Sequence, residues 1–585
     1  MEHKQPITFP YRQRYFLLVD VSQETWQKVP LGEEESKSLL GGRFLALGLW
    51  DKYAHYDNLD SQAYESGNPI VIAAGSACDT SLACCDSYTL VTRSLLTKRL
   101  SVNFCNGALA KVLYGCGYSA IVIIGRFRRL SGLSVDFQSV LFSNAEKFHD
   151  YTTSDMASQF PGNTSIALGP AGEHQVPYAS IWIDGSNTGR GGVGTIFGLK
   201  NIKYITFSSS ISGRGAYDPK RLGTAMHHYQ RAFKHSKVAN MIAQEGSVTL
   251  INQANSLGWA AVDDFSLRSD GRLWALASYP RDYDLEPVEQ GCAQCPLKTV
   301  SSKKGPLPDF SLALALGANL ELFDYRSVSD LMQRCSLLGL DYYSVGAIFA
   351  WARKTRGLGT LPFLPDLGKA TSAQPYLHLL DSIAYKKGTG EQLANTLDAL
   401  VLQYGGQEYA YQVNGQALAP FDVRALPAQA LLTSLGDDTV VIPELLKGVH
   451  YHRGQERKIA KWAVFCQDYR YAMESLGLCP WFSLPFFDGP LFLQPCKLYT
   501  DRAFSFLASL ASATEGYEVT AKQMAAWGKK AWALQMKIDQ LLVEEELVAN
   551  LPEQMLVNST SNHPRARVVP LARLLDAYYV LRGLK

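Results

Sequence analysis

The chain has 585 residues, more than the roughly 250–300 that one hydrophobic core can organise, so two to four domains are expected. Apolar residues make up 47% and charged residues 19%, which excludes a disordered or collagen-like polymer. Lys and Arg number 56 against 54 Asp and Glu, so the net charge is 56 − 54 = +2. This balance argues against nucleic acid or an anionic membrane as a partner and favours a small substrate or another protein.

No stretch approaches the roughly 18 uninterrupted apolar residues that a membrane helix needs. The first residues carry Glu, Lys and Arg where a signal peptide needs its apolar centre. We therefore expect a cytoplasmic protein without a membrane segment. The 11 cysteines are too few for a disulfide framework in so long a chain, so we expect them to serve packing or metal ligation.

The first ~210 residues predict strands separated by Gly-rich turns. Residues 68–75, 119–127 and 176–183 are short β-branched runs bounded by turn residues. From about residue 215 the apolar positions recur with helical spacing, most clearly in 218–242, 330–354 and 522–551. The sequence thus predicts a β-rich N-terminal domain followed by a mostly helical body.

A glycine-rich segment surrounds Arg190. Its nearest glycines are Gly189, Gly191 and Gly192. Such glycines let a backbone approach a ligand closely, and a guanidinium can bind a phosphate in fork geometry. The alternative is a plain turn leaving a strand. The GxGxxG spacing does not indicate a dinucleotide fold, because the next strand-like run starts at Lys203 and leaves no room for a crossover helix.

Cys292 and Cys295 form a CxxC motif, in which two thiolates converge on one metal ion. A four-iron cluster usually takes four thiolates, and position 299 is Thr. A half zinc site or reduced packing thiols are the alternatives. Glu146 and His149 have ExxH spacing, which here is more typical of an exposed loop pair than of a chelating pair.

Two segments, 336–341 and 474–479, have similar sequences. Each places a Gly-Leu pair before a polar side chain, Asp341 in the first and Cys479 in the second. This similarity suggests two related loops that hold the two halves of a pseudo-symmetric ligand. Coincidence is the alternative, since Leu-Gly-Leu is a common sequence.

Taken together, phrases over nearly the whole chain resemble the aldehyde ferredoxin oxidoreductase family of tungsten–pterin enzymes. They are, in chain order, LLGGRFLALGLWDKY, VTRSLLT, GYSAIVIIG, LGPAGEHQVPYASI, GRGGVGTIFGLKNIK, CAQCP, LGLDYYSVG, PFDVRAL, SLGLCPWF and LLDAYYVLRG. Each phrase alone is unspecific, but their number and order are specific.

The resemblance implies an α+β fold in three parts. Residues 1–212 would form a double β-sheet domain that binds the pterins, and 213–420 and 421–585 two helical domains that cover it. The cofactors implied are a bis-pterin with tungsten or molybdenum, held by dithiolene sulfurs rather than side chains, Mg²⁺, and an iron–sulfur cluster that passes electrons to ferredoxin or an iron–sulfur subunit. A homodimer and a hetero-complex both remain open.

The resemblance also implies roles for individual residues. Arg190 and Gly191 match the segment that contacts the cofactor's phosphates and magnesium, and Asn103 lies near the family's magnesium-contacting Asn. Asp341 closes one pterin loop, while Cys479 closes the other and ligates the cluster with Cys292 and Cys295. The remaining residues expected at the cofactor are Gly189, Gly192, Leu340, Glu474 and Leu478.

The chain departs from the family pattern at its catalytic positions. Ser311 stands where the family has a Glu, and Thr439 falls near its His, so the acid–base pair is missing. Asp309, Asp437 and Asp438 are the substitutes offered by the sequence. Thr299 replaces the third cluster cysteine, so a [4Fe–4S] cluster on three cysteines, a [3Fe–4S] cluster and no cluster all remain open.

Two functions therefore follow from the sequence. The first is an oxidoreductase that carries out two-electron chemistry on an aldehyde, a carboxylate or another small substrate with altered acid–base residues. The second is a family member that has lost catalysis and serves as a binding or scaffolding subunit of a redox complex. Metal and pterin content would discriminate between them, because a scaffold need keep neither.

Overall fold

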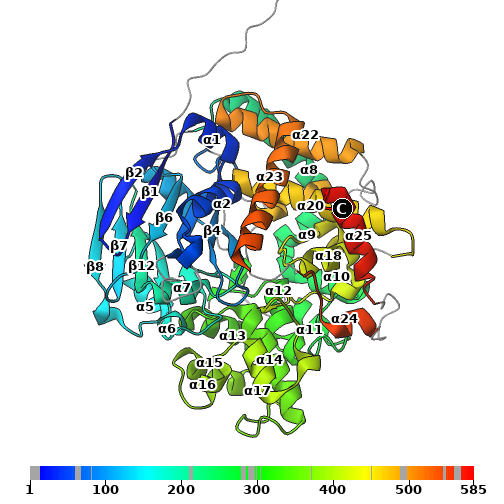
Figure 1. The fold of residues 1–585 in the computed structure, drawn as a ribbon. Helices are drawn as coiled ribbons and strands as arrows, with labels where there is room; N and C mark the ends of the chain where they lie inside the picture. The colour runs from blue at the N-terminus through cyan, green and yellow to red at the C-terminus, as the bar shows by residue number, and fades with distance from the viewer. Residues whose placement is uncertain are drawn as a thin grey trace, which may run out of the picture.

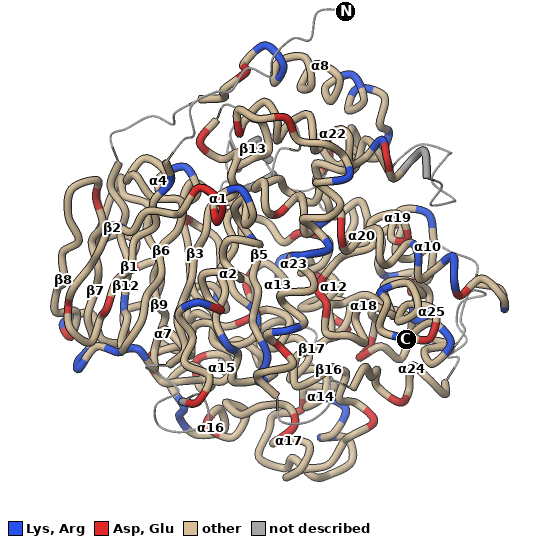
Figure 2. Tube along the Cα trace, turned by 45° about the horizontal axis from the view of Figure 1, so that its top comes forward, with Lys and Arg blue, Asp and Glu red and all other residues tan. Residues whose placement is uncertain are grey.

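The computed structural model describes residues 13–58, 67–80, 82–209, 215–278, 285–287, 297, 300–302, 305–369, 372–448, 451–487, 497–543, 548–558 and 568–585. The strands of the N-terminal part gather on one side and the helices fill the other (Figure 1). The predicted α+β class, a double sheet followed by a mostly helical chain, is confirmed. Lys and Arg are interspersed with Asp and Glu along the trace in both parts (Figure 2).

The N-terminal part contains two six-stranded sheets with the same topology. Their orders are β2-β1-β6-β3-β4-β5 and, read in the matching direction, β8-β7-β12-β9-β10-β11. In each sheet the sixth strand in chain order lies parallel to the first and antiparallel to the third. The strands are β1 (Tyr15–Asp20), β2 (Thr25–Pro30), β3 (Ile70–Ala74), β4 (Ser87–Arg93), β5 (Leu100–Asn106), β6 (Ala120–Ile124), β7 (Ser131–Val135), β8 (Val140–Asn144), β9 (Thr164–Leu168), β10 (Ile181–Ile183), β11 (Ser186–Thr188) and β12 (Ile202–Phe207).

Side-chain alternation along the strands builds two cores. Successive side chains point to opposite faces of a sheet. Leu17 of β1 therefore shares a core with Leu133 of β7 in the second sheet, while its neighbour Phe16 belongs to a core on the other face. That outer face is covered by α2 (Gly42–Tyr53), whose buried Trp50 donates its indole N–H to the carbonyl of Pro69 at 3.1 Å.

The remainder of the described chain is mainly helical. Its longer helices are α8 (Pro219–His235), α9 (Lys237–Glu245), α10 (Leu250–Leu257), α13 (Tyr325–Leu338), α14 (Tyr342–Gly357), α15 (Gln374–Ala384), α17 (Leu397–Tyr404), α18 (Pro427–Ser434), α20 (Glu456–Leu476), α22 (Lys497–Glu515), α23 (Ala521–Leu542) and α25 (Leu571–Arg582). The shorter α-helices are α1 (Glu33–Leu39), α4 (Leu109–Gly115), α5 (Thr153–Ser158), α6 (Pro170–Glu173), α7 (Val193–Leu199), α11 (Leu273–Ala277), α12 (Phe310–Leu316), α16 (Thr389–Leu393), α19 (Ile442–Lys447), α21 (Leu484–Phe487) and α24 (Glu553–Val557). No helix among the described residues is both long and apolar enough to cross a membrane.

Most of the predicted elements appear, with breaks where tertiary contacts require them. The runs 68–75 and 119–127 contain β3 and β6, but 176–183 is a strand only over its last three residues. The helical pattern 330–354 is interrupted at Gly339, where the chain turns with a φ of 73°. The division at 212/213 and 420/421 stays a prediction.

Both interruptions arise at the same contact between the helical chain and the second sheet. The amide of Ser180 donates to the carbonyl of Gly339 at 2.8 Å, and the amide of Asp341 donates to the carbonyl of Tyr178 at 3.0 Å. The Tyr178 carbonyl and the Ser180 amide therefore bond to the loop between α13 and α14 instead of to a sheet neighbour.

An equivalent contact joins α20 to the first sheet. The amides of Ser76 and Ala77 donate to the carbonyls of Ser475 and Leu476, each at 3.1 Å, beside Gly477. Gly75 directly follows β3 and approaches Gly477, and Gly169 directly follows β9 and approaches Leu338 and Gly339, so the two Gly-Leu loops occupy matching positions on the two sheets. The similarity in the sequence thus has a structural counterpart.

We predict that Gly75→Ala lowers the thermal unfolding midpoint, because a Cβ at Gly75 would lie 2.1 Å from Cα of Gly477 and force the loop away. Overpacking of this kind costs about 1–3 kcal/mol. Scanning calorimetry measures the change. The matched control is Gly223→Ala in α8, where a Cβ meets no atom within 4 Å and helix propensity alone should stabilise by about 0.5–1 kcal/mol. Equal midpoints for the two variants would contradict the role given to Gly75.

Candidate functional site

A cavity of about 920 Å³ lies where the sheets meet the helical chain. Its walls come from β5 and the turn before α7, from the starts of α12 and α14, and from the segment around α18. Of the residues singled out in the sequence, those that line it are Asn103, Gly189, Arg190, Asp309, Ser311, Asp341, Asp437, Asp438 and Cys479. The structure therefore brings together side chains from all three parts of the chain.

Other predicted residues do not line this cavity. They are Gly191, Gly192, Leu340, Glu474 and Leu478. Cys292 and Cys295 lie outside the described residues, as does Thr299. Gly191 and Gly192 instead shape the turn that carries Arg190. Both have a φ of 73°, and a Cβ on Gly192 would lie 2.3 Å from the carbonyl oxygen of Pro177.

The backbone of Arg190 is held by β5. Its amide donates to Oδ1 of Asn103 at 2.7 Å, and its carbonyl accepts from the hydroxyl of Ser101 at 2.6 Å. Asn103 also donates to Ser101 at 2.8 Å. The amide side chain of Asn103 thus fixes the arginine turn, while its oxygen retains a second lone pair for another contact.

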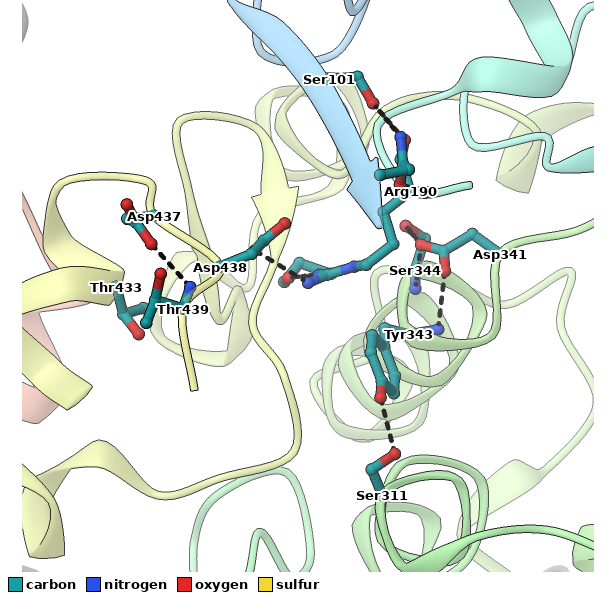
Figure 3. A network of polar contacts seen from close by, with 12 residues as sticks. Ser101, Arg190, Ser311, Asp341, Tyr343, Ser344, Thr433, Asp437, Asp438 and Thr439 are labelled. Carbon is teal, nitrogen blue, oxygen red and sulfur yellow. Dashed lines mark hydrogen bonds and ion pairs between the residues drawn. The ribbon is translucent and has the colours of Figure 1, made fainter. Parts of the chain in front are cut away.

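The guanidinium of Arg190 points between the start of α14 and the coil segment that carries Asp438 (Figure 3). Its Nη1 lies 3.4 Å from Oδ1 of Asp438, its Nη2 donates to the carbonyl of Ala417, and it stacks over the ring of Tyr343 with 4.8 Å to the centroid. Its Nε is buried and has no acceptor among the described residues. The same is true of Nδ2 of Asn414, so two residues of the lining each hold a buried donor without a partner among the described residues.

A short hydrogen-bonded chain runs from the cavity wall to an exposed carboxylate. The hydroxyl of Tyr343 and Oγ of Ser311 lie 2.7 Å apart, and the hydroxyl of Ser311 donates to Oδ1 of Asp309 at 2.7 Å. Burial and the charge of Asp309 raise the pKa of Tyr343 above its ordinary value, so the phenol is protonated at neutral pH. Asp309 also caps α12 by accepting from the amide of Leu312.

Asp341 and Glu474, the acidic residues of the two Gly-Leu loops, have different surroundings. Asp341 caps α14 by accepting from the amide and hydroxyl of Ser344. Glu474 is fully buried between Arg43, at 2.6 Å, and Arg470, at 2.5 Å. Glu474 does not line the cavity, but two of its connections reach the lining: Arg470 directly, and Arg43 through its hydrogen bond to Gln535 at 3.1 Å.

Two further carboxylates in the wall have pKa values shifted in opposite directions. Burial would raise the pKa of Asp437, but Arg43 and the hydrogen bonds from Thr439 and Gln467 outweigh burial and lower it. Burial raises the pKa of Asp539 to about 6, since the amide of Leu100 and nearby arginines offset it only in part. Asp437 therefore stays ionised, whereas Asp539 exchanges its proton near neutral pH.

The two positions where the acid–base pair was expected differ in location. Ser311 lines the cavity, but Thr439 is buried outside the lining and its hydroxyl has no partner among the described residues. Its neighbour Asp438 is 47% exposed and faces Arg190 instead. The sequence singled out neither Tyr343 nor Asp539, although Tyr343 stands in the phrase LGLDYYSVG.

Comparison with known proteins gives a consistent result. The model of the aldehyde ferredoxin oxidoreductase N-terminal domain matches residues 16–209, and the model of domains 2 and 3 of the same enzyme matches 224–585. A tungsten-containing aldehyde ferredoxin oxidoreductase of Pyrococcus furiosus is 26% identical over 97% of this chain and 95% of its own length. Its counterpart from Thermococcus kodakarensis is 24% identical over the same shares.

Two more relatives differ in their described activity. The WOR-like subunit of an aliphatic sulfonate oxidoreductase from Pyrococcus furiosus is 22% identical over 70% of both chains. The solved structure of the active site complex BamBC of benzoyl coenzyme A reductase, in complex with 1,5-dienoyl-CoA, has a TM-score of 0.78, with 18% identity, 98% coverage of this chain and 95% of that chain, which supports the fold alone. With family models matched over nearly its whole length, the chain belongs to the aldehyde ferredoxin oxidoreductase family.

Proposed function

We propose that this oxidoreductase binds a tungsten or molybdenum bis-pterin cofactor in the central cavity and oxidises or reduces a small substrate by two electrons. The observation that carries the proposal is the buried, unpaired Nε of Arg190 at a wall that both sheets and the helical chain complete. An unpaired buried donor costs about 1–3 kcal/mol, so its retention supports an anionic ligand at this point. The tungsten named for the relatives supports the same cofactor class.

The residues present fit a phosphate-bearing pterin. Arg190 offers a charged donor, Asn414 offers a neutral donor, and the turn at Gly189 leaves the backbone uncovered. A Mg²⁺ ion bound together with the phosphates would take oxygen ligands, and Oδ1 of Asn103, with its second lone pair, could supply one. The loops at Asp341 and Cys479 would hold one pterin each.

When bound, the metal–pterin group supplies the two-electron redox chemistry, and the chain's own task is to position the substrate and move a proton. Tyr343, Ser311 and Asp309 are placed for the second task. A substrate hydroxyl that donates its proton to the oxygen of Tyr343 lets the phenol pass its own proton to Ser311, whose proton moves to Asp309. Asp309 is exposed, so the proton can leave to solvent.

Three aromatic rings in the cavity wall favour an apolar substituent on the substrate. Phe310 stacks on Phe421 with centroids 5.9 Å apart and meets the edge of Trp481 at 5.9 Å. Such a wall excludes water and binds apolar surface. We propose an aldehyde, or the carboxylate formed from it, with an aliphatic or aromatic side chain.

Electrons would leave through an iron–sulfur cluster ligated by Cys292, Cys295 and Cys479. Cys479 lines the cavity, and its amide donates to the carbonyl of Cys84 at 3.2 Å, which fixes the loop end. Three cysteines leave one cluster position open to another ligand. We propose ferredoxin or an iron–sulfur subunit as the electron partner, in line with the relative that is named as a subunit.

Arg190→Ala should lower the tungsten and pterin content of the purified protein severalfold, because a charged phosphate contact is lost. The measurement is elemental analysis with pterin release from the same sample. Arg221→Ala is the matched control, since it removes an equal charge from an exposed ion pair with Glu518. Full metal content in Arg190→Ala would contradict the placement of the cofactor, and parent protein without metal or pterin would favour the scaffolding function.

Ser311→Ala and Tyr343→Phe should each reduce kcat by roughly 10²-fold with little change in KM, since a positioned proton carrier contributes about 10²–10⁴ in rate. The assay is aldehyde oxidation with an artificial electron acceptor, in which kcat is followed against pH. Ser158→Ala, on the exposed surface of α5, removes a hydroxyl elsewhere and should leave kcat unchanged. Unchanged kcat in both variants, at equal tungsten content, would rule out the proton route.

Cys479→Ser should remove most of the iron and its electron paramagnetic resonance signal, because the cluster has no spare cysteine in its predicted set. The comparison is Cys116→Ser, a buried thiol that donates to the carbonyl of Ser208 at 3.4 Å and does not line the cavity. If both variants keep the same iron per chain, Cys479 is not a cluster ligand.

A further inference from the structure

Two histidines and two carboxylates meet at the surface of the N-terminal part, outside the central cavity. His149 and Asp150 follow a short turn after β8, and Glu173 and His174 stand at the end of α6. None of the four lines the cavity. We propose that His149, Asp150 and Glu173 bind a divalent metal ion of the zinc class, and that His174 orients one of these ligands.

The separations of the ligand atoms fit a single ion. One ligand atom from each of the three residues lies within 4.8 Å of the others. Nδ1 of His149 is 3.4 Å from Oδ2 of Asp150, and its Nε2 is 3.7 Å from Oε2 of Glu173. These distances are long for hydrogen bonds. An imidazole gives an ion only one nitrogen, so only one of these two pairs can already stand near ligand spacing, which is roughly 3.3–3.6 Å for a tetrahedral ion with bonds of about 2.0–2.2 Å. The third ligand atom, within 4.8 Å of the others, would move inward when the ion binds.

Glu173 is the fixed member of the set. Its side chain is only 3% exposed, and Oε1 pairs with the buried ammonium of Lys203. Oε2 accepts from the amide of Asp150 at 3.1 Å and faces His149. The formal charges of Asp150, Glu173 and Lys203 sum to −1, so a divalent cation is favoured by charge as well as by ligand type.

His149 supplies the mobile ligand, and His174 supplies support. The ring of His149 is 61% exposed and makes no hydrogen bond among the described residues. Its contacts with them are the two long ion pairs with Asp150 and Glu173 and an edge contact with the ring of His174 at 6.0 Å, so a nitrogen can turn to an ion while it stays beside the same carboxylates. Nε2 of His174 lies 2.8 Å from Oδ1 of Asp150. A histidine that donates to a ligating carboxylate in this way holds the ligand's orientation.

The ligand set is not the ExxH pair considered from the sequence. Glu146 bonds to Asn144 at 3.2 Å and is not part of the cluster. The ion would tie the turn at His149 to α6, which begins directly after Gly169, where the loop of Gly339 docks. The site therefore has a structural role on the second sheet and does not depend on the proposed redox function.

The test is a Co²⁺ titration of the purified protein after dialysis against a chelator. Co²⁺ on nitrogen and oxygen ligands shows d–d bands without the sulfur charge transfer that cysteine sites would give. We expect the parent to bind one equivalent of Co²⁺ with these d–d bands, and we expect His149→Ala and Asp150→Asn to lose it. Asn tolerates the φ of 63° at position 150, so this second variant keeps the turn. His174→Ala should weaken binding by 10–100-fold, as is typical of an outer hydrogen-bond partner.

The control is the double variant His227→Ala with His228→Ala, which removes two adjacent exposed histidines of α8. It should keep the full Co²⁺ equivalent, and added Zn²⁺ should displace Co²⁺ from both parent and control. Equal Co²⁺ binding by His149→Ala and the parent would overturn the proposal. So would a parent protein that binds no Co²⁺ through nitrogen and oxygen ligands. Tungsten and iron content should stay at the parent level in all these variants, which separates this test from those of the redox function.

Discussion

The attachment of the helical chain to the sheets depends on backbones that touch without side chains between them. At the first sheet, a Cβ built on Gly75 would lie only 2.1 Å from Cα of Gly477. At the second sheet, a Cβ built on Gly169 would lie 2.5 Å from the carbonyl oxygen of Leu338. Only glycine permits such approach, and it also permits the left-handed turn at Gly477. The polar ends of both loops, Asp341 and Cys479, reach the cavity because these contacts hold the loops close.

The charged residues around the cavity follow from the same geometry. Once the loop at Gly477 is docked, Glu474 lies beneath it, away from water, and needs compensating charge. Arg43 of α2 and Arg470 of α20 supply it. A buried carboxylate with two arginines is costly to break, because the loss of either partner leaves an uncompensated charge. Arg470 in turn borders the cavity, so the ion pairs that fix α20 also set the charge that a ligand meets.

Sequence reasoning succeeded where the signal is local. The strand runs, the glycine turn at Arg190 and the helical periods were readable because each spans few residues, and the family resemblance supplied the double sheet. It could not show that Glu474 turns away from the cavity, since its partner Arg43 is 431 positions distant. Nor could it join Tyr343 to Ser311, because their contact depends on how α14 packs against α12. From the sequence, Ser311 indicates only that the expected Glu is absent. The structure adds that Ser311 contacts Tyr343.

The matching topology of the two sheets has a consequence for the order in which the protein is made. Each sheet is a local unit that can form soon after its strands emerge, yet the first sheet receives its covering loop only from residues 475–479, about 400 positions after Gly75. At about 5–20 residues per second, synthesis of that stretch takes roughly 20–80 s. During that time β5 carries the turn at Arg190 but lacks the helical segments that complete the cavity wall in the finished molecule.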